Sequence, residues 1–376
     1  MPDFVPGLEL NHIFYVEAVK PILDREFPDL PYSAALIGVG SEVLGFDTEM
    51  SRDHHWGPRV MLFVRDEDAY PREAIDEMLR QNLPYWVRGH STHFEASYSE
   101  GDRGTPVSKS LEQGPVNHLV EIMGIREYFQ QYLGFDIDME LDAIDWLTLP
   151  QQKLRTVTAG AVYHDGIGLG AVRERFSYYP HDVWLYLLLS GWTRLGQEEH
   201  LAPRAGYVGD ELGSAIIAGR LVRDIMNLCF LMEKTYAPYA KWFGTAFAQL
   251  DCAAELTPIL RKVQRGETWQ ERERHLCQAY EITAQMHNAL GITKKIPAKV
   301  SSFHDRPFKV IHSWRFEEAI REEIRDPLLK EISSKRCIGS IDQFSDNVDL
   351  RSSSTLRIEL RALYGDKLPR PASFEV

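Results

Sequence analysis

The sequence has few cysteines and no excess of basic residues, and each absence excludes a class of protein. The four cysteines in 376 residues lie too far apart to form a Cys-x-x-Cys pair, so no disulfide framework is predicted. Lysine and arginine number 42 against 55 aspartate and glutamate, for a net charge of −13. This balance argues against a general nucleic-acid-binding protein, because phosphate contacts need clustered basic side chains.

The sequence also lacks long hydrophobic runs. The longest apolar stretches, such as residues 183–189, are far shorter than the ~18–20 residues of a membrane span. The first residues have neither the basic nor the apolar region of a signal peptide. We therefore expect a cytoplasmic protein with no membrane partner. A content of 44% hydrophobic and 26% charged residues is typical of a chain that buries real cores.

The hydrophobic pattern changes in character near residue 149. Before it, helical spacing alternates with short apolar runs that indicate strands at 32–40, 60–64 and 118–123. The polar segment 97–114 is predicted to be a loop. From residue 146 onward, strand signals become rare and long helical patterns dominate. We predict an α/β plus α fold: a small mixed-sheet domain over residues 1–149, then a helical bundle domain over residues 150–376.

A glycine-serine turn follows the first predicted strand. Gly38-Val-Gly-Ser-Glu-Val-Leu-Gly45 has Val43 where a dinucleotide-binding loop needs its third glycine, and it has no lysine for a Walker loop. What remains is a strand that ends in Gly40-Ser41. Its backbone N–H groups and one hydroxyl suit anionic phosphate oxygens. A tight turn in which glycine relieves crowding is the alternative.

A cluster of metal-binding residue types comes just before the second predicted strand. In Asp53-His54-His55, carboxylate and imidazole are both ligands of divalent ions. On an extended chain, Asp53 and His55 share one side. The alternative is a polar loop with hydrogen-bonded histidines. The triplet also matches a signature of metal-dependent phosphoesterases, although the upstream aspartate pairs of that class are missing.

Together, these two features resemble the DNA-polymerase-β-like nucleotidyltransferase superfamily. Its pattern is a Gly-Ser turn, two acidic residues one apart, and a third acid on a later strand. More narrowly, the chain is similar to a poorly characterised family within it, a domain of unknown function with a helical C-terminal part. The similar segments are 40–59, which ends in Trp-Gly-Pro-Arg, and 149–154, 158–165, 236–247, 303–308 and 338–344.

The resemblance implies a role for several residues. Gly40 and Ser41 would contact the phosphates of a nucleoside triphosphate, and Asp53 and position 55 would hold the metal, Mg²⁺ or Mn²⁺. Glu121 would be the third carboxylate, with Glu95 as the alternative. The implied activity is metal-dependent transfer of a nucleotidyl group to a hydroxyl of an unidentified acceptor, which the acidic charge makes a small molecule or protein rather than a nucleic acid.

The sequence departs from the superfamily at His55, where a carboxylate is expected. An imidazole removes one negative charge, and Mg²⁺ prefers oxygen ligands. Three alternatives follow: catalysis with a softer ion such as Mn²⁺, catalysis with one ion, or nucleotide binding without catalysis. Phosphoester hydrolysis is a further alternative.

Several basic residues are candidates for gripping the triphosphate. Arg220 and Arg223 lie on one long predicted helix, where intrahelical pairing with Asp224 or Asn227 is the alternative role. The other candidates are Arg59, Lys153 and Lys241. The dipeptide His164-Asp165 is kept as a further site candidate, against a turn or helix cap.

Overall fold

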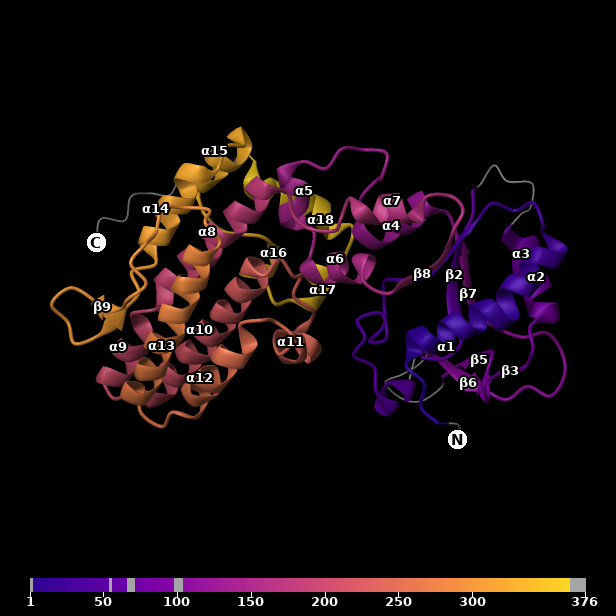
Figure 1. The fold of residues 1–376 in the computed structure, drawn as a ribbon, viewed down its shortest axis with the longest axis horizontal. Helices are drawn as coiled ribbons and strands as arrows, with labels where there is room; N and C mark the ends of the chain where they lie inside the picture. The colour runs from indigo at the N-terminus through magenta and orange to yellow at the C-terminus, as the bar shows by residue number, and fades with distance from the viewer. Residues whose placement is uncertain (1–2, 54–55, 66–71, 98–103, 366–376) are drawn as a thin grey trace. The chain divides into compact units, whose positions relative to one another are not determined.

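A computed structural model describes residues 3–53, 56–65, 72–97 and 104–365. The chain forms two compact units (Figure 1). Unit 1 comprises Met1–Glu140 and Lys153–Ser177, and unit 2 comprises Leu141–Gln152 and Tyr178–Val376. No helix in the described part of the chain is both long and apolar enough to cross a membrane.

Unit 1 is built on a mixed four-stranded sheet in the order β7-β2-β1-β8. β2 runs parallel to β7 and antiparallel to β1, and β8 pairs antiparallel with the other edge of β1. The sheet strands are β1 (Ser33–Leu36), β2 (Arg59–Phe63), β7 (Leu119–Met123) and β8 (Ala161–Asp165). Two small hairpins pair β3 (Trp86–Val87) with β4 (His90–Ser91) and β5 (His93–Ala96) with β6 (Pro106–Lys109).

Helices complete unit 1. They are α1 (Gly7–Phe14), η1 (Tyr15–Val19), α2 (Lys20–Glu26), η2 (Glu49–Asp53), α3 (Arg72–Asn82), α4 (Ile125–Leu133), α6 (Gln151–Thr158, of which residues 151–152 belong to unit 2) and α7 (Leu169–Glu174). Phe14, Leu23 and Leu79 from α1 to α3 share one hydrophobic core with Leu62 and Val120 of the sheet.

Successive residues of β2 and β7 point to opposite faces of the sheet. Val60 and Leu62 belong to the core cluster just described. Because successive side chains point to opposite faces, Arg59 and Met61 lie on the other face. Glu121 is in register with Met61 and therefore shares that face. This second face carries the candidate site.

Unit 2 is mainly helical. Its helices are α5 (Ala143–Thr148), α8 (His181–Glu198), α9 (Leu201–Tyr207), α10 (Glu211–Met232), α11 (Ala240–Phe247), α12 (Ala253–Arg265), α13 (Trp269–Ala289), α14 (Trp314–Glu323), α15 (Pro327–Lys335), α16 (Ile341–Phe344), α17 (Val348–Ser352), α18 (Leu356–Leu360) and η3 (Arg361–Tyr364). The short strands β9 (Ser301–Ser302) and β10 (Lys309–Val310) pair with each other. The predicted fold class, a mixed-sheet α/β part followed by a helical region, is confirmed.

One local prediction was wrong. The segment 97–114, predicted to be a loop, contains strand β6, which the polar composition hid. Residues 161–165 form β8, a strand that was not predicted. Because β8 pairs with β1, residues 153–177 belong to unit 1, so the compact units do not divide at the predicted boundary of 149 and 150.

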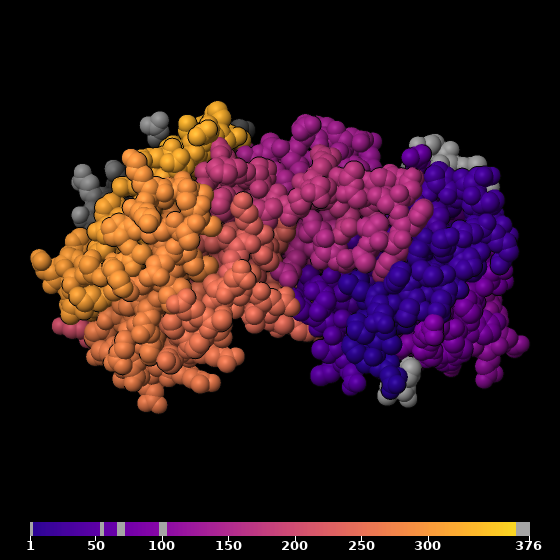
Figure 2. Space-filling model, viewed as in Figure 1, coloured from indigo at the N-terminus to yellow at the C-terminus, as the bar shows by residue number. Residues whose placement is uncertain are grey.

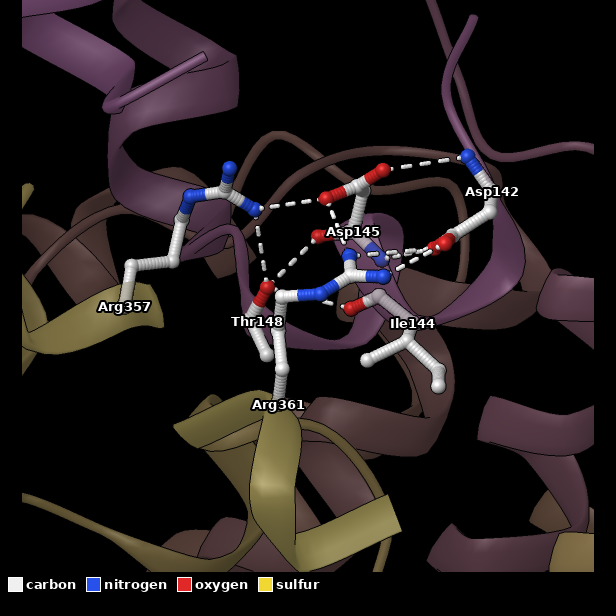
Figure 3. A network of polar contacts seen from close by, with 6 residues as sticks. All are labelled: Asp142, Ile144, Asp145, Thr148, Arg357 and Arg361. Atoms are coloured by element: carbon white, nitrogen blue, oxygen red, sulfur yellow. Dashed lines mark hydrogen bonds and ion pairs between the residues drawn. The ribbon is translucent and has the colours of Figure 1, made fainter. Parts of the chain in front are cut away.

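A partly buried polar network joins the C-terminal helices of unit 2 to α5 and to the residue before it, Asp142 (Figure 3). Arg357 donates from Nη1 to Asp145 Oδ1 at 3.0 Å and to Thr148 Oγ1 at 3.0 Å. Arg361 donates to the same Asp145 oxygen at 2.5 Å and to Asp142 Oδ2 at 2.5 Å. We call Asp142, Asp145, Thr148, Arg357 and Arg361 the C-terminal clasp.

A neutral histidine in the core of unit 2 makes stability depend on pH. His287 is fully buried, and its Nδ1 accepts a hydrogen bond from Trp192 Nε1 at 3.3 Å. Burial lowers the pKa of His287 to about 4. An unfolded histidine binds its proton near pH 6.5, so the unfolded state holds more protons between these two values and stability falls as pH falls.

We therefore expect acidification from about pH 6.5 to pH 4 to cost up to about 3 kcal/mol through His287 alone. The measurement is urea unfolding at several pH values for the wild type and for His287→Gln, which keeps an acceptor for Trp192 but does not titrate. The difference between the two curves isolates His287. Parallel curves would contradict the assignment.

Candidate functional site

The Gly40-Ser41 turn follows β1 in unit 1. The strand ends at Leu36, and beyond it the N–H of Gly38 donates to Thr156 O at 2.9 Å. It then bends through Gly40, at φ 134°, a backbone conformation open to glycine and strained for other residues. Phe46 N donates back to Ser41 O at 2.9 Å and closes the turn.

A buried ion pair between Arg59 and Glu42 holds this turn in place. Arg59, the first residue of β2, donates from Nε and Nη2 to Glu42 Oε1 at 2.9 Å and 2.6 Å. The same Nη2 donates to Val39 O at 2.5 Å. The Glu42 side chain is 3% exposed and that of Arg59 is 10% exposed. One guanidinium therefore holds both the backbone before Gly40 and the side chain after Ser41.

The ion pair also explains why residue 40 is glycine. A Cβ on Gly40 would lie 2.6 Å from Glu42 Oε2 and 2.7 Å from Glu42 Cδ. Both distances are closer than side-chain carbons approach, so any larger residue would displace the Glu42 carboxylate. The glycine is needed both for its φ angle and for the space it leaves.

The turn leaves polar groups for a ligand. Among the contacts of the described residues, neither the N–H groups of Gly40 and Ser41 nor the Ser41 hydroxyl donates to a protein acceptor. Ser41 is half-buried rather than fully covered. Successive backbone N–H groups at a turn of this kind make a concave site for an anion.

Tyr128 of α4 closes the turn on its other side. A Cβ on Gly38 would lie 2.7 Å from the Tyr128 hydroxyl. This hydroxyl is buried and has no hydrogen-bond partner within the described residues. Burial raises the pKa of Tyr128 far above its usual range. Sequence analysis missed both Tyr128 and Glu42. Glu42 could have been found from the sequence, because it is an acid directly after the Gly-Ser pair. Nothing in the local sequence indicated Tyr128.

In the segment after the turn, Asp47 and Gly57 have structural roles. Asp47 Oδ2 accepts hydrogen bonds from Trp56 Nε1 at 3.1 Å and from Gly7 N at 2.7 Å. Gly57, at φ 142°, leaves room for the ring of Phe94, because a Cβ would lie 2.8 Å from that ring.

The predicted metal ligands are described in part. Asp53 is the last residue of η2, and His55 lies outside the described residues. Glu121 is exposed on β7, on the sheet face that carries Arg59. The alternative, Glu95, is on β5 of a separate hairpin, with Oε1 3.6 Å from His93 Nε2. No three His, Cys, Asp or Glu side chains of the described part are grouped to hold a metal ion.

The predicted basic residues are spread over both units. In unit 1, Lys153 donates to Tyr132 O at 2.5 Å. In unit 2, Arg220 pairs with Glu198 and Arg223 pairs with Asp346. Lys241 is exposed beside the ring of Trp242, at 4.8 Å. Nucleotide binding by any of them stays a prediction.

Of the candidate pair His164-Asp165, the aspartate binds the N–H groups at the start of α7. Asp165 accepts from Ser33 Oγ at 2.7 Å and from the N–H groups of Gly168, Leu169 and Gly170 at the start of α7, at 2.8–2.9 Å. Burial opposes ionisation, but these donors lower the pKa of Asp165. The Asp165 carboxylate already accepts four hydrogen bonds, and these give the residue a structural role.

The chain is similar to a family of unknown function and to a solved structure. Residues 146–243 match the model of a domain of unknown function, DUF4037. A solved structure of a nucleotidyltransferase-like protein from Exiguobacterium sibiricum 255-15 is similar over 84% of this chain and 91% of that chain, at 10% identity and a TM-score of 0.30. A TM-score this low does not establish a common fold. No curated protein matches the sequence.

Proposed function

We propose that unit 1 binds a nucleoside triphosphate at the Gly40-Ser41 turn and that the protein is a nucleotidyltransferase. The acceptor hydroxyl would attack the α-phosphorus and form a new phosphorus–oxygen bond. The bond from the α-phosphorus to the bridging oxygen would break, pyrophosphate would leave, and the hydroxyl proton would pass to solvent. The acceptor would be a small molecule or a protein.

One observation carries this proposal: the turn offers free donors in a fixed position. The Gly40 and Ser41 N–H groups and the Ser41 hydroxyl lack protein acceptors among the described contacts. The buried Arg59–Glu42 pair holds the backbone before them, at Val39, and the side chain after them, at Glu42. Because these donors are held in place before the ligand arrives, binding phosphate oxygens does not cost the conformational entropy of ordering them.

Mg²⁺ or Mn²⁺ is part of the proposal, with Asp53, His55 and Glu121 as the ligands. The described side chains alone do not form a group that could hold a metal ion. When bound, it would offset charge on the phosphates.

A second candidate function, nucleotide binding without transfer, is favoured by His55 itself. A histidine in place of a carboxylate lowers the negative charge available to two ions. Replacing His55 with aspartate separates the two functions. A weakened enzyme should gain Mg²⁺-dependent release of pyrophosphate, whereas a site that only binds should not.

The test is calorimetric titration of the four nucleoside triphosphates, with Mg²⁺ and separately with Mn²⁺. We expect metal-dependent binding that weakens at least tenfold, or by about 1.4 kcal/mol, in Ser41→Ala with Asp53→Ala. Ser108→Ala is the matched control, because Ser108 is exposed on β6 of the same unit.

Each other outcome has a defined meaning. If no nucleotide binds under either metal, the proposal is wrong. If binding survives the double variant, the site lies elsewhere in the chain. Hydrolysis of a bound nucleotide with no acceptor present would indicate the third alternative, a phosphoesterase.

A further inference from the structure

Four large apolar side chains between residues 207 and 216 of unit 2 are exposed to solvent. Tyr207 ends α9 and is 64% exposed, and Val208 directly after it is 79% exposed. Leu212 and Ile216, in the first turns of α10, are 74% and 57% exposed. Figure 2 shows residues of this part of the chain, in rose, at the surface of the unit. Single exposed apolar residues are ordinary, whereas a cluster of them marks an interaction surface.

The exposed residues of α10 share one side of the helix. Leu212, Ala215, Ile216 and Gly219 are three or four residues apart, a spacing that places side chains on one side. We call these four residues the α10 face. The opposite side carries buried residues such as Leu221. This half of α10 is therefore apolar on both sides, a pattern typical of a helix that is covered all round.

The α10 face combines large and small residues in an order that fits a second copy of itself. In a two-fold symmetric, antiparallel helix pair, positions at equal distances on either side of the axis come together. With the axis between Ala215 and Ile216, Leu212 of one copy lies opposite Gly219 of the second copy. Ile216 then lies opposite Ala215. Each large side chain meets a small one, so the two helices can pack closely.

The charges at the two ends of the α10 face are complementary in the same arrangement. Glu211 comes before the face and its side chain is 42% exposed, and Arg220 comes after it and is 55% exposed. The axis sets Glu211 of one copy opposite Arg220 of the second copy. Each already pairs within its own chain, Glu211 with Arg272 and Arg220 with Glu198. A parallel pair would set like charges side by side, which disfavours that direction.

We propose that the α10 face, with Tyr207 and Val208 at its edge, is the interface of a symmetric homodimer. A helix pair of a few turns lies at the low end of stable interfaces, near ~1,200 Å² of total buried surface. We therefore expect a weak dimer with a Kd of about 10 µM. This inference does not depend on the function proposed for unit 1.

The test is sedimentation-velocity ultracentrifugation of the full chain over concentrations from about 1 to 200 µM, which bracket the expected Kd. We expect the sedimentation coefficient to rise from that of a monomer to that of a dimer. Leu212→Glu would place a carboxylate in the apolar part of the interface and should raise the Kd at least tenfold. Leu212 is exposed in the single chain, so urea unfolding of the variant below the Kd should be unchanged.

A second variant separates the dimer from the fold. A Cβ on Gly219 would meet only the end of the Gln264 side chain, at 3.6 Å, which is an ordinary contact. Alanine is more favourable than glycine inside a helix, so Gly219→Ala should keep or raise the stability of the single chain. In the dimer, the new methyl group would meet Leu212 of the second copy, and the Kd should rise at least threefold.

Val348→Glu is the matched control. Val348 is 75% exposed on α17 of the same unit, so its replacement adds the same charge to an equally exposed apolar position and should leave the Kd unchanged. A control that weakens the dimer as much as Leu212→Glu does would place the interface at the C-terminal helices instead and overturn the proposal.

Three further results would overturn it. A chain that stays monomeric at every concentration would leave the α10 face to a different protein. A dimer that survives Leu212→Glu would use another surface. A dimer that is lost in Leu212→Glu but unchanged in Gly219→Ala would rule out the antiparallel arrangement.

Discussion

Replacing Glu42 with glutamine is expected to lower the free energy of unfolding of unit 1 by about 3–5 kcal/mol, the usual cost of breaking a buried ion pair. Glutamine has almost the same shape, so the loss comes from charge. The guanidinium of Arg59 is 10% exposed and would stay buried without a counter-ion. The measurement is urea unfolding of the full chain, with the transition of each unit followed separately.

Glu49→Gln is the matched control for this experiment. Glu49 is exposed at the start of η2, close in sequence to Glu42, so its replacement should change stability by less than about 0.5 kcal/mol. In the double variant Glu42→Gln with Arg59→Met, the losses should not add, because the two residues share one interaction. Additive losses, or a Glu42→Gln effect as small as that of the control, would contradict the role of the pair.

The second large effect is expected at the C-terminal clasp. Asp145→Asn should destabilise unit 2 by about 3–5 kcal/mol, because two arginines would lose their shared carboxylate. Asp145 is 8% exposed and Arg357 is 6% exposed, so water replaces little of the lost interaction. Figure 3 shows both guanidinium groups directed at this one side chain. Thermal or urea unfolding of unit 2 measures the loss.

The clasp offers two comparisons. Asp349→Asn changes an exposed acid on α17 in the same C-terminal region and should have little effect. Arg361→Gln should cost less than Asp145→Asn, because the Arg361 side chain is 33% exposed and Asp145 would still pair with Arg357. If Arg361→Gln proved the more damaging of the two, Asp145 would not be the centre of the network.

The sequence by itself determined the features that depend on local spacing. Helical periodicity predicted that long helices dominate after residue 146, and α8 is one of them, because a helix repeats its apolar positions within a few residues. The strand β2 was visible in the same way as a short apolar run. The Gly-Ser turn was also found locally, since glycine marks a backbone bend.

Tertiary structure decided the features that join distant residues. β8 is a strand because it pairs with β1, more than a hundred residues earlier. Arg59, predicted to contact phosphate, has Glu42 and Val39 as its protein partners, which no local pattern indicated. Tyr128 meets Gly38 through the packing of α4 against the sheet. Hydrogen bonds and ion pairs depend on distances in space, and a sequence pattern records only distances along the chain.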